Sequence, residues 1–119
     1  MKIGIASDHR GVILKEKIKN YLNGKYQIID YGTNSIESVD YPQYAYKIGE
    51  SVRDNKIDLG ILICGTGIGM SIACNKVKKV RCAKVTTKEE AFLARSHNNA
   101  NVIALSENIT NYKEIIDTF

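Results

Sequence analysis

Short apolar runs alternate with amphipathic stretches along the chain. The apolar runs predict strands over 2–6, 26–31, 59–63, 80–85 and 101–105. Between and after them, apolar residues recur at helical spacing, which predicts helices over 11–22, 42–54, 70–76, 87–96 and 112–119. Because neighbouring parallel strands need crossover connections, we expect a single α/β domain. Its core would be a doubly wound, Rossmann-like, five-stranded parallel sheet with helices on both faces.

Several residues mark where these elements begin and end. Ser7-Asp8 is a good capping pair for the first helix, and Asn23-Gly24 ends that helix. Pro42, the only proline, fits the first turn of the second helix. Residues 59–63 form the most apolar stretch, which suits a central strand covered by helices on both sides.

Three polar loops are candidates for a binding site, because ligands of such sheets bind beyond the carboxyl ends of the strands. Residues 7–11 follow the first predicted strand, and 64–69 follow the third. Residues 96–101 lead into the fifth strand rather than out of one. That position suits a role on a neighbouring subunit.

Composition and charge narrow the class of protein. The 119 residues suffice for one domain of ordinary globular composition. The chain has no run of about 18 apolar residues and no signal-peptide pattern, so we expect a cytoplasmic protein that does not contact a membrane. Its three cysteines are then free thiols, and no Cys/His cluster indicates a metal. The basic cluster at 76–81 has no interleaved aromatic residues, so no nucleic-acid partner is expected.

The loop at 64–69 reads Cys-Gly-Thr-Gly-Ile-Gly. Its glycines let the backbone turn tightly and point several N–H groups into one concavity, and the following helix adds a partial positive charge. Such a nest suits a phosphate or the oxyanion of a reaction intermediate. The pattern is neither a Walker A loop nor a full dinucleotide fingerprint. The alternative is that the glycines only allow the helix to pack closely on the strand.

Cys64 stands at the carboxyl end of the third strand, before this helix N-terminus. A thiol in such a position loses its proton more readily, and the thiolate can act as a nucleophile or as a base toward a carbon acid. Alone, a buried strand-end cysteine would be the simpler interpretation, but the glycine loop beside it favours chemistry. Cys74 and Cys82 are interpreted as small buried hydrophobic residues.

Both histidines fall in the predicted site loops. His9 lies between Asp8 and Arg10, so a carboxylate, an imidazole and a guanidinium occupy three consecutive residues. His97 begins a run with three asparagines. A single such histidine is usually a surface residue, Asp8 alone could be only a helix cap, and Arg10 only a solvated charge.

Taken together, these segments resemble the ribose-5-phosphate isomerase type B family and its galactose-6-phosphate isomerase relatives. The resemblance rests on residues 3–11, 40–42, 60–69 and 97–102, which stand in the expected order and spacing. The family interconverts an aldose phosphate and a ketose phosphate through an enediolate, with no metal or organic cofactor. It forms homodimers, often tetramers, whose pockets are shared between subunits.

The resemblance implies a role for each matching residue. Cys64 would be the base that moves a proton between C1 and C2, Thr66 would shuttle a proton between the substrate oxygens, and His97 would open the sugar ring. Asp8 would hold substrate hydroxyls and His9 the phosphate. The remaining expected substrate contacts are Tyr41 and Asn98, with the backbone of Gly65, Gly67, Ile68 and Gly69 holding the enediolate.

Two departures from the family concern the phosphate. Members commonly have a glycine after the fifth strand and, two residues later, a phosphate-binding arginine, whereas Ser106 and Asn108 stand here. Members also usually continue into a tail with further arginines, so the domain at 1–119 is expected to lack that tail. His9, Arg10 and Arg95 are the remaining candidates for binding the phosphate.

Two other functions stay open at this point. One is an isomerase of 6-phosphohexoses such as allose or galactose 6-phosphate. The other is a non-catalytic module that binds a nucleotide or sugar phosphate in the glycine nest. A reactive thiol at Cys64 would favour an enzyme, because a binding module has no need of one.

Overall fold

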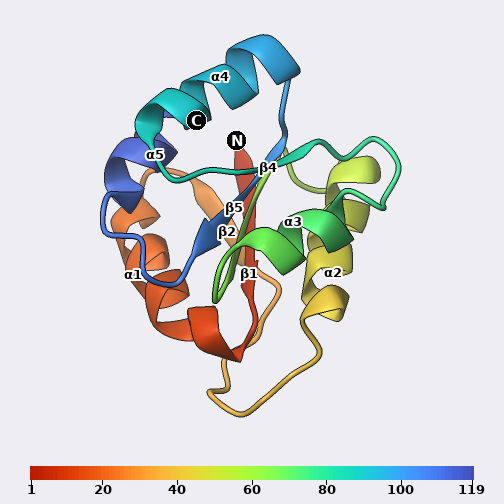
Figure 1. Ribbon diagram of the computed structural model, residues 1–119, viewed down its shortest axis with the longest axis vertical. Coiled ribbons are helices and arrows are strands. Elements are labelled where there is room, and N and C mark those ends of the chain that lie inside the picture. Colours follow the sequence, from red (N-terminus) through yellow and green to blue (C-terminus); the bar gives the residue numbers. More distant parts are fainter.

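Five parallel strands form one sheet in the computed structural model, which describes residues 1–119 (Figure 1). They are β1 (Lys2–Ser7), β2 (Gln27–Asp30), β3 (Leu59–Cys64), β4 (Cys82–Lys84) and β5 (Val102–Ser106). The strand order is β2-β1-β3-β5-β4, so the apolar β3 is central and the short β4 lies at one edge. This architecture confirms the expected doubly wound parallel sheet.

Four α-helices and one 3-10 turn connect the strands, and a fifth α-helix follows β5. They are η1 (His9–Gly11), α1 (Val12–Leu22), α2 (Tyr41–Arg53), α3 (Ile68–Cys74), α4 (Lys88–Asn98) and α5 (Tyr112–Thr118). The predicted cap at Asp8 is confirmed, because its Oδ1 accepts hydrogen bonds from the N–H groups of Arg10 and Gly11. Pro42 lies in the first turn of α2, as predicted.

Strand alternation divides the core into two layers. Odd-numbered strand residues such as Ile5, Ile63 and Leu105 pack on one face with α1, α4 and α5. Even-numbered residues such as Leu62 and Ala104 pack on the other face with α2 and α3. Because Cys64 is even-numbered, it belongs to the layer with α2 and α3.

The largest difference from the sequence prediction concerns residues 96–101, of which 96–98 belong to a helix and only 99–101 form a loop. Helix α4 continues to Asn98 and ends at Asn99, which adopts a left-handed conformation with φ of 49°. The expected strand at 80–85 also shortens to Cys82–Lys84. At the end of α4 the residues are polar and carry little periodic signal, whereas at β4 the apolar Val80 and Val85 extended the predicted strand beyond the residues that pair with β5.

No helix has the length and apolar character of a membrane-spanning segment. All three cysteines are free, and no three His, Cys, Asp or Glu side chains gather in an arrangement that could hold a metal ion.

Candidate active site

The candidate site lies where β1, β3 and β5 end at the same edge of the sheet. Ser7 pairs with Ile63, and Cys64 pairs with Ser106, so the three strand ends are in register. The N–H of Asp8 continues this pairing by donating to the carbonyl of Ile63 at 3.1 Å. The segments that follow the strands therefore converge around Cys64.

Cys64 is buried, with 6% of its surface exposed. The N–H of Gly67 donates to its sulfur at 3.1 Å, so the loop folds back over the thiol. Gly67 has φ of 82°, and a Cβ there would meet the carbonyl carbon of Leu105 at 3.1 Å. Both the backbone conformation and the close approach to β5 thus require glycine at this position.

The N–H groups of the loop are arranged differently from the expected open nest. Gly67 directs its N–H to the sulfur of Cys64, and Ile68 donates to Oγ1 of Thr66 at 3.1 Å. Two donors therefore already have partners within the loop. Thr66 itself is exposed, which leaves its hydroxyl accessible at the rim.

Tyr41 packs against the glycine loop that follows β3. A Cβ on Gly69 would lie 2.9 Å from Cε1 of its ring, so the ring rests directly on the glycine backbone. Tyr41 is the first residue of α2, and Gly69 lies in the first turn of α3. The absence of a side chain at Gly69 thus allows the tyrosine ring to pack closely against the loop that contains Cys64.

His9 faces the segment between β2 and α2. Its Nδ1 accepts a hydrogen bond from the N–H of Val39 at 3.3 Å. Because Nδ1 accepts, a neutral imidazole in this arrangement carries its proton on Nε2. His9 can therefore present an N–H donor through its other ring nitrogen.

The segment facing His9 is anchored by a buried cation that sequence reasoning missed. Lys15 is fully buried, and its Nζ donates to Asp30 at 2.6 Å and to Asn34 at 2.7 Å. Lys19 donates to the same oxygen of Asp30 at 2.8 Å. Burial alone raises the pKa of Asp30, but these donors and the N–H of Gly32 outweigh it and lower the pKa below its usual value.

Arg10 is not the freely solvated charge that its helix-start position suggests. Its Nη2 lies 2.6 Å from Oε1 of Glu107, and this hydrogen bond, with the charge of Glu107, raises the pKa of Arg10. Ser106, next to Glu107, donates from Oγ to the carbonyl of Gly65 at 2.8 Å. The segment after β5 thus belongs to the site, although only the site loops at 7–11, 64–69 and 96–101 were predicted.

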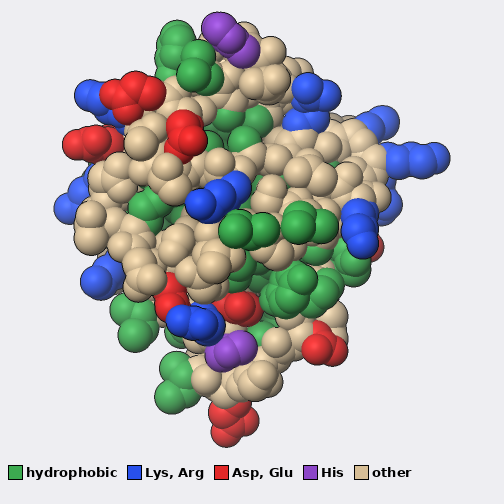
Figure 2. Space-filling view, viewed as in Figure 1, with side chains coloured by type: hydrophobic (Ala, Val, Ile, Leu, Met, Phe, Trp, Pro, Cys, Tyr) green, Lys and Arg blue, Asp and Glu red, His purple; other side chains and the backbone are tan.

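His97 and Asn98 do not join Cys64 within one chain. Helix α4 runs antiparallel to the strands, so its last residues lie near the start of β5, at the opposite end of the sheet (Figure 1). Figure 2 likewise shows the two histidine side chains at opposite ends of the molecule. Arg95, on the same helix, donates to the carbonyl of Ala100 at 2.6 Å and is also remote from Cys64.

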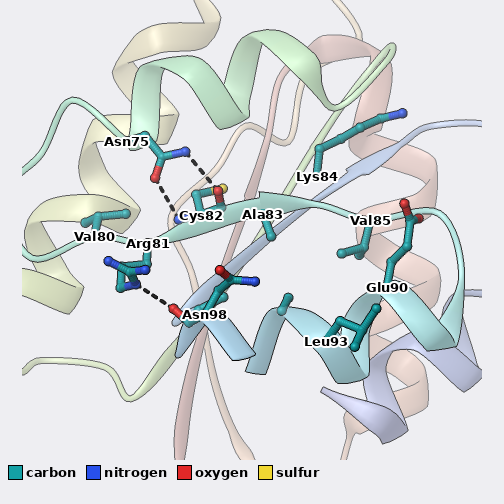
Figure 3. Close-up of a pocket in the computed structure, with 12 residues that line it drawn as sticks. Asn75, Val80, Arg81, Cys82, Ala83, Lys84, Val85, Glu90, Leu93 and Asn98 are labelled. Atoms are coloured by element: carbon teal, nitrogen blue, oxygen red, sulfur yellow. Dashed lines mark hydrogen bonds between the residues drawn. The ribbon is translucent and has the colours of Figure 1, made fainter. Parts of the chain in front are cut away.

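Asn98 instead lines a groove of about 480 Å³ between α4 and the edge strand β4 (Figure 3). Arg81 donates to the carbonyl of Asn98 there at 2.5 Å. The side-chain amide of Asn75 pairs with both backbone groups of Cys82, at 2.7 and 2.8 Å. This groove does not include Cys64.

Comparison with known proteins identifies relatives along nearly the whole chain. The sequence model described as Ribose/Galactose Isomerase matches residues 3–119. Ribose-5-phosphate isomerase B of Escherichia coli is 40% identical over 122 residues, which cover 99% of this chain and 82% of that protein. A putative sugar phosphate isomerase of Bacillus subtilis is 46% identical over 111 residues, covering 92% and 74%.

Solved structures of similar proteins share the fold. A ribose 5-phosphate isomerase of Thermotoga maritima superposes with a TM-score of 0.96 at 52% identity, covering 99% of this chain and 84% of that one. Ribose-5-phosphate isomerase B of Mycoplasma genitalium, solved with bound ribulose-5-phosphate, gives 0.92 at 44% identity, covering 99% and 82%.

Proposed function

The chain belongs to the Ribose/Galactose Isomerase family and is a sugar-phosphate isomerase, and we propose that it interconverts ribose 5-phosphate and ribulose 5-phosphate with Cys64 as the base. The observation that carries this proposal is the placement of the Cys64 thiol. It is buried at the carboxyl edge of the sheet and accepts a hydrogen bond from the Gly67 N–H. If Cys64 is deprotonated, the N–H of Gly67 donates a hydrogen bond that stabilises the negative charge of its sulfur.

The reaction needs one proton moved between neighbouring carbons. The Cys64 thiolate takes the proton from C2 of the open-chain aldose, which leaves an enediolate, and returns it to C1 to form the ketose. A second proton passes from the oxygen on C2 to the oxygen on C1, and the exposed hydroxyl of Thr66 is placed at the rim to carry it. The backbone N–H groups of 65–69 that have no partner within the loop, unlike those of Gly67 and Ile68, hold the enediolate oxygens.

The other side chains of the converging loops orient the sugar phosphate. His9 offers its Nε2 proton and Arg10 its free guanidinium donors to the phosphate. Asp8 holds substrate hydroxyls with the carboxylate oxygen that does not cap the helix. Tyr41, resting on Gly69, closes one side of the pocket.

His97 and Asn98 complete the site from a second copy of the chain. Within one chain they lie at the far end of the sheet, and both are exposed. A homodimer, or a tetramer built from such dimers, places them against the partner's pocket. His97 then opens the sugar ring and Asn98 contacts the substrate.

Turnover of three sugar phosphates by the purified protein tests the substrate and the base together. We expect ribose 5-phosphate to be converted with a higher kcat/KM than allose 6-phosphate or galactose 6-phosphate, and Cys64→Ala to lower kcat by about 1000-fold with an unchanged circular dichroism spectrum. A higher kcat/KM for a hexose phosphate would contradict the proposal that ribose 5-phosphate is the substrate. Normal turnover by Cys64→Ala would contradict the assignment of Cys64 as the base. If the wild-type protein converts none of the three sugar phosphates, a binding module is favoured.

Alkylation gives a second test that separates the enzyme from a binding module. Iodoacetamide should modify Cys64, and ribose 5-phosphate should protect it. Cys82, half-buried and outside the site, is the matched thiol whose modification the sugar should not change.

A further inference from the structure

An ion pair stands at the mouth of the site, between residues 97 positions apart in the sequence. Arg10 uses Nη2 to reach Oε1 of Glu107 at 2.6 Å. The Arg10 side chain is 59% exposed and that of Glu107 21%. An incoming ligand can therefore reach the guanidinium while Glu107 holds one of its nitrogens.

Both partners are anchored to the loop that contains Cys64. A Cβ on Gly65 would lie 3.3 Å from Nε of Arg10, so the arginine side chain rests on the residue next to Cys64. The N–H of Glu107 donates to the carbonyl of Cys64 at 2.8 Å. The carboxylate therefore stays beside the site even when its hydrogen bond to Arg10 is broken.

A groove of about 570 Å³ opens next to this ion pair. Arg10 and Lys17 are the cations in its lining, and Glu107 is the only acidic residue there. An anion that enters the groove is attracted by the two cations and repelled by one carboxylate.

We propose that Glu107 sets the affinity of the site for the substrate's phosphate by occupying Arg10 in the free protein. This inference rests on the proposed function, in which Arg10 binds that phosphate. An exposed arginine–carboxylate contact through one oxygen is weak, whereas a phosphate dianion binds a guanidinium through two oxygens. The phosphate therefore displaces Glu107, and the displaced carboxylate, held nearby by its backbone, reduces the net gain.

Steady-state kinetics of Glu107→Gln test this competition, since glutamine keeps the shape and removes the charge. We expect KM for ribose 5-phosphate, and the inhibition constant of inorganic phosphate, to fall about fivefold. Arg10→Gln should raise both constants, and adding Glu107→Gln to that variant should have no further effect. Asp54→Asn is the matched control, because it removes the carboxylate of another exposed arginine pair and should change neither constant.

Several outcomes would overturn the proposal. A higher KM in Glu107→Gln would mean that the carboxylate positions Arg10 for the phosphate. An unchanged KM, or an equal effect in the Arg10→Gln background, would mean that Glu107 does not act through Arg10.

Binding of inorganic phosphate separates this proposal from the proposed function. The ¹⁵N resonance of the Arg10 Nε in labelled protein reports binding without turnover. The wild type could fail to isomerise ribose 5-phosphate while Glu107→Gln binds inorganic phosphate about fivefold more tightly than the wild type does. That result would contradict the proposed activity but support the competition between Glu107 and phosphate for Arg10. If turnover is normal but phosphate binding is unchanged in the variant, the competition alone fails.

Discussion

The backbone N–H of Gly67 lies 3.1 Å from the sulfur of Cys64 and points at it. This contact ties the left-handed turn of the loop to the proposed base. The conformation of residue 67 and the environment of the thiol are therefore one structural feature, and a change in the first must disturb the second.

Substitution of Gly67 tests this coupling. Gly67→Ala should cost more than about 1–2 kcal/mol of unfolding free energy, because a left-handed alanine is strained and its Cβ also meets Leu105. We expect kcat to fall at least about tenfold as the loop shifts. Gly24→Ala is the matched control, since Gly24 has the same φ of 82° with nothing within 4 Å. It should lose only about 1 kcal/mol and no activity, as measured by urea unfolding and turnover.

Mixing two inactive variants tests whether the site is shared between subunits. Cys64→Ala and His97→Ala should each be inactive alone. After unfolding and refolding together, half of the dimers are hybrids with one intact site of two, so about a quarter of wild-type activity should return. Absence of recovery, with hybrid dimers demonstrated by mass spectrometry, would place His97 outside the partner's site.

Replacing Lys15, the buried cation beneath the segment at 32–40, should reduce the free energy of unfolding more than replacing its neighbour Lys19. Lys15→Met should lower the free energy of unfolding by about 3 kcal/mol, because it breaks a buried pair with Asp30. Lys19→Met removes a partly exposed cation from the same carboxylate and should cost less than about 1 kcal/mol. Equal costs in urea unfolding would contradict the assigned role of Lys15.

Asp30 should make stability depend on pH in the acid range. Because its pKa is lower in the folded chain than its ordinary value of 3.8, the unfolded chain takes up the proton first as the pH falls. Its contribution is complete above about pH 5 and is lost as the pH falls through the folded-state pKa. Asp30→Asn should therefore be less stable at neutral pH, with a flatter loss of stability in acid. An unchanged acid slope would show that other carboxyl groups control it.

The sheet was predictable from sequence because each strand is a short apolar run between amphipathic segments. The end of α4 was not, since His97 and Asn98 are polar whether they lie in a loop or on an exposed helical turn. Lys15 was missed for a similar reason. A lysine in an amphipathic helix normally faces solvent, and its burial depends on a carboxylate 15 residues away.

The site was predictable in part. Asp8 and His9 follow β1 and Cys64 ends β3, at the edge where parallel sheets bind ligands, and the structure brings these segments together. The role of Glu107 could not be predicted from its position in the sequence, because it depends on a contact with Arg10, 97 residues away. Contacts between charged side chains far apart in sequence become visible only once the strand order is known.

The position of β4 has a consequence for how the protein is made. β4 pairs only with β5, which the ribosome completes later, whereas β1, β2 and β3 can pair as soon as Cys64 has emerged. Ser106 and Glu107, which contact the loop around Cys64, arrive with that same last strand. Before β5 is made, the loop around Cys64 therefore lacks two of its neighbours, and the proposed base reaches its final surroundings only when the last strand of the sheet is in place.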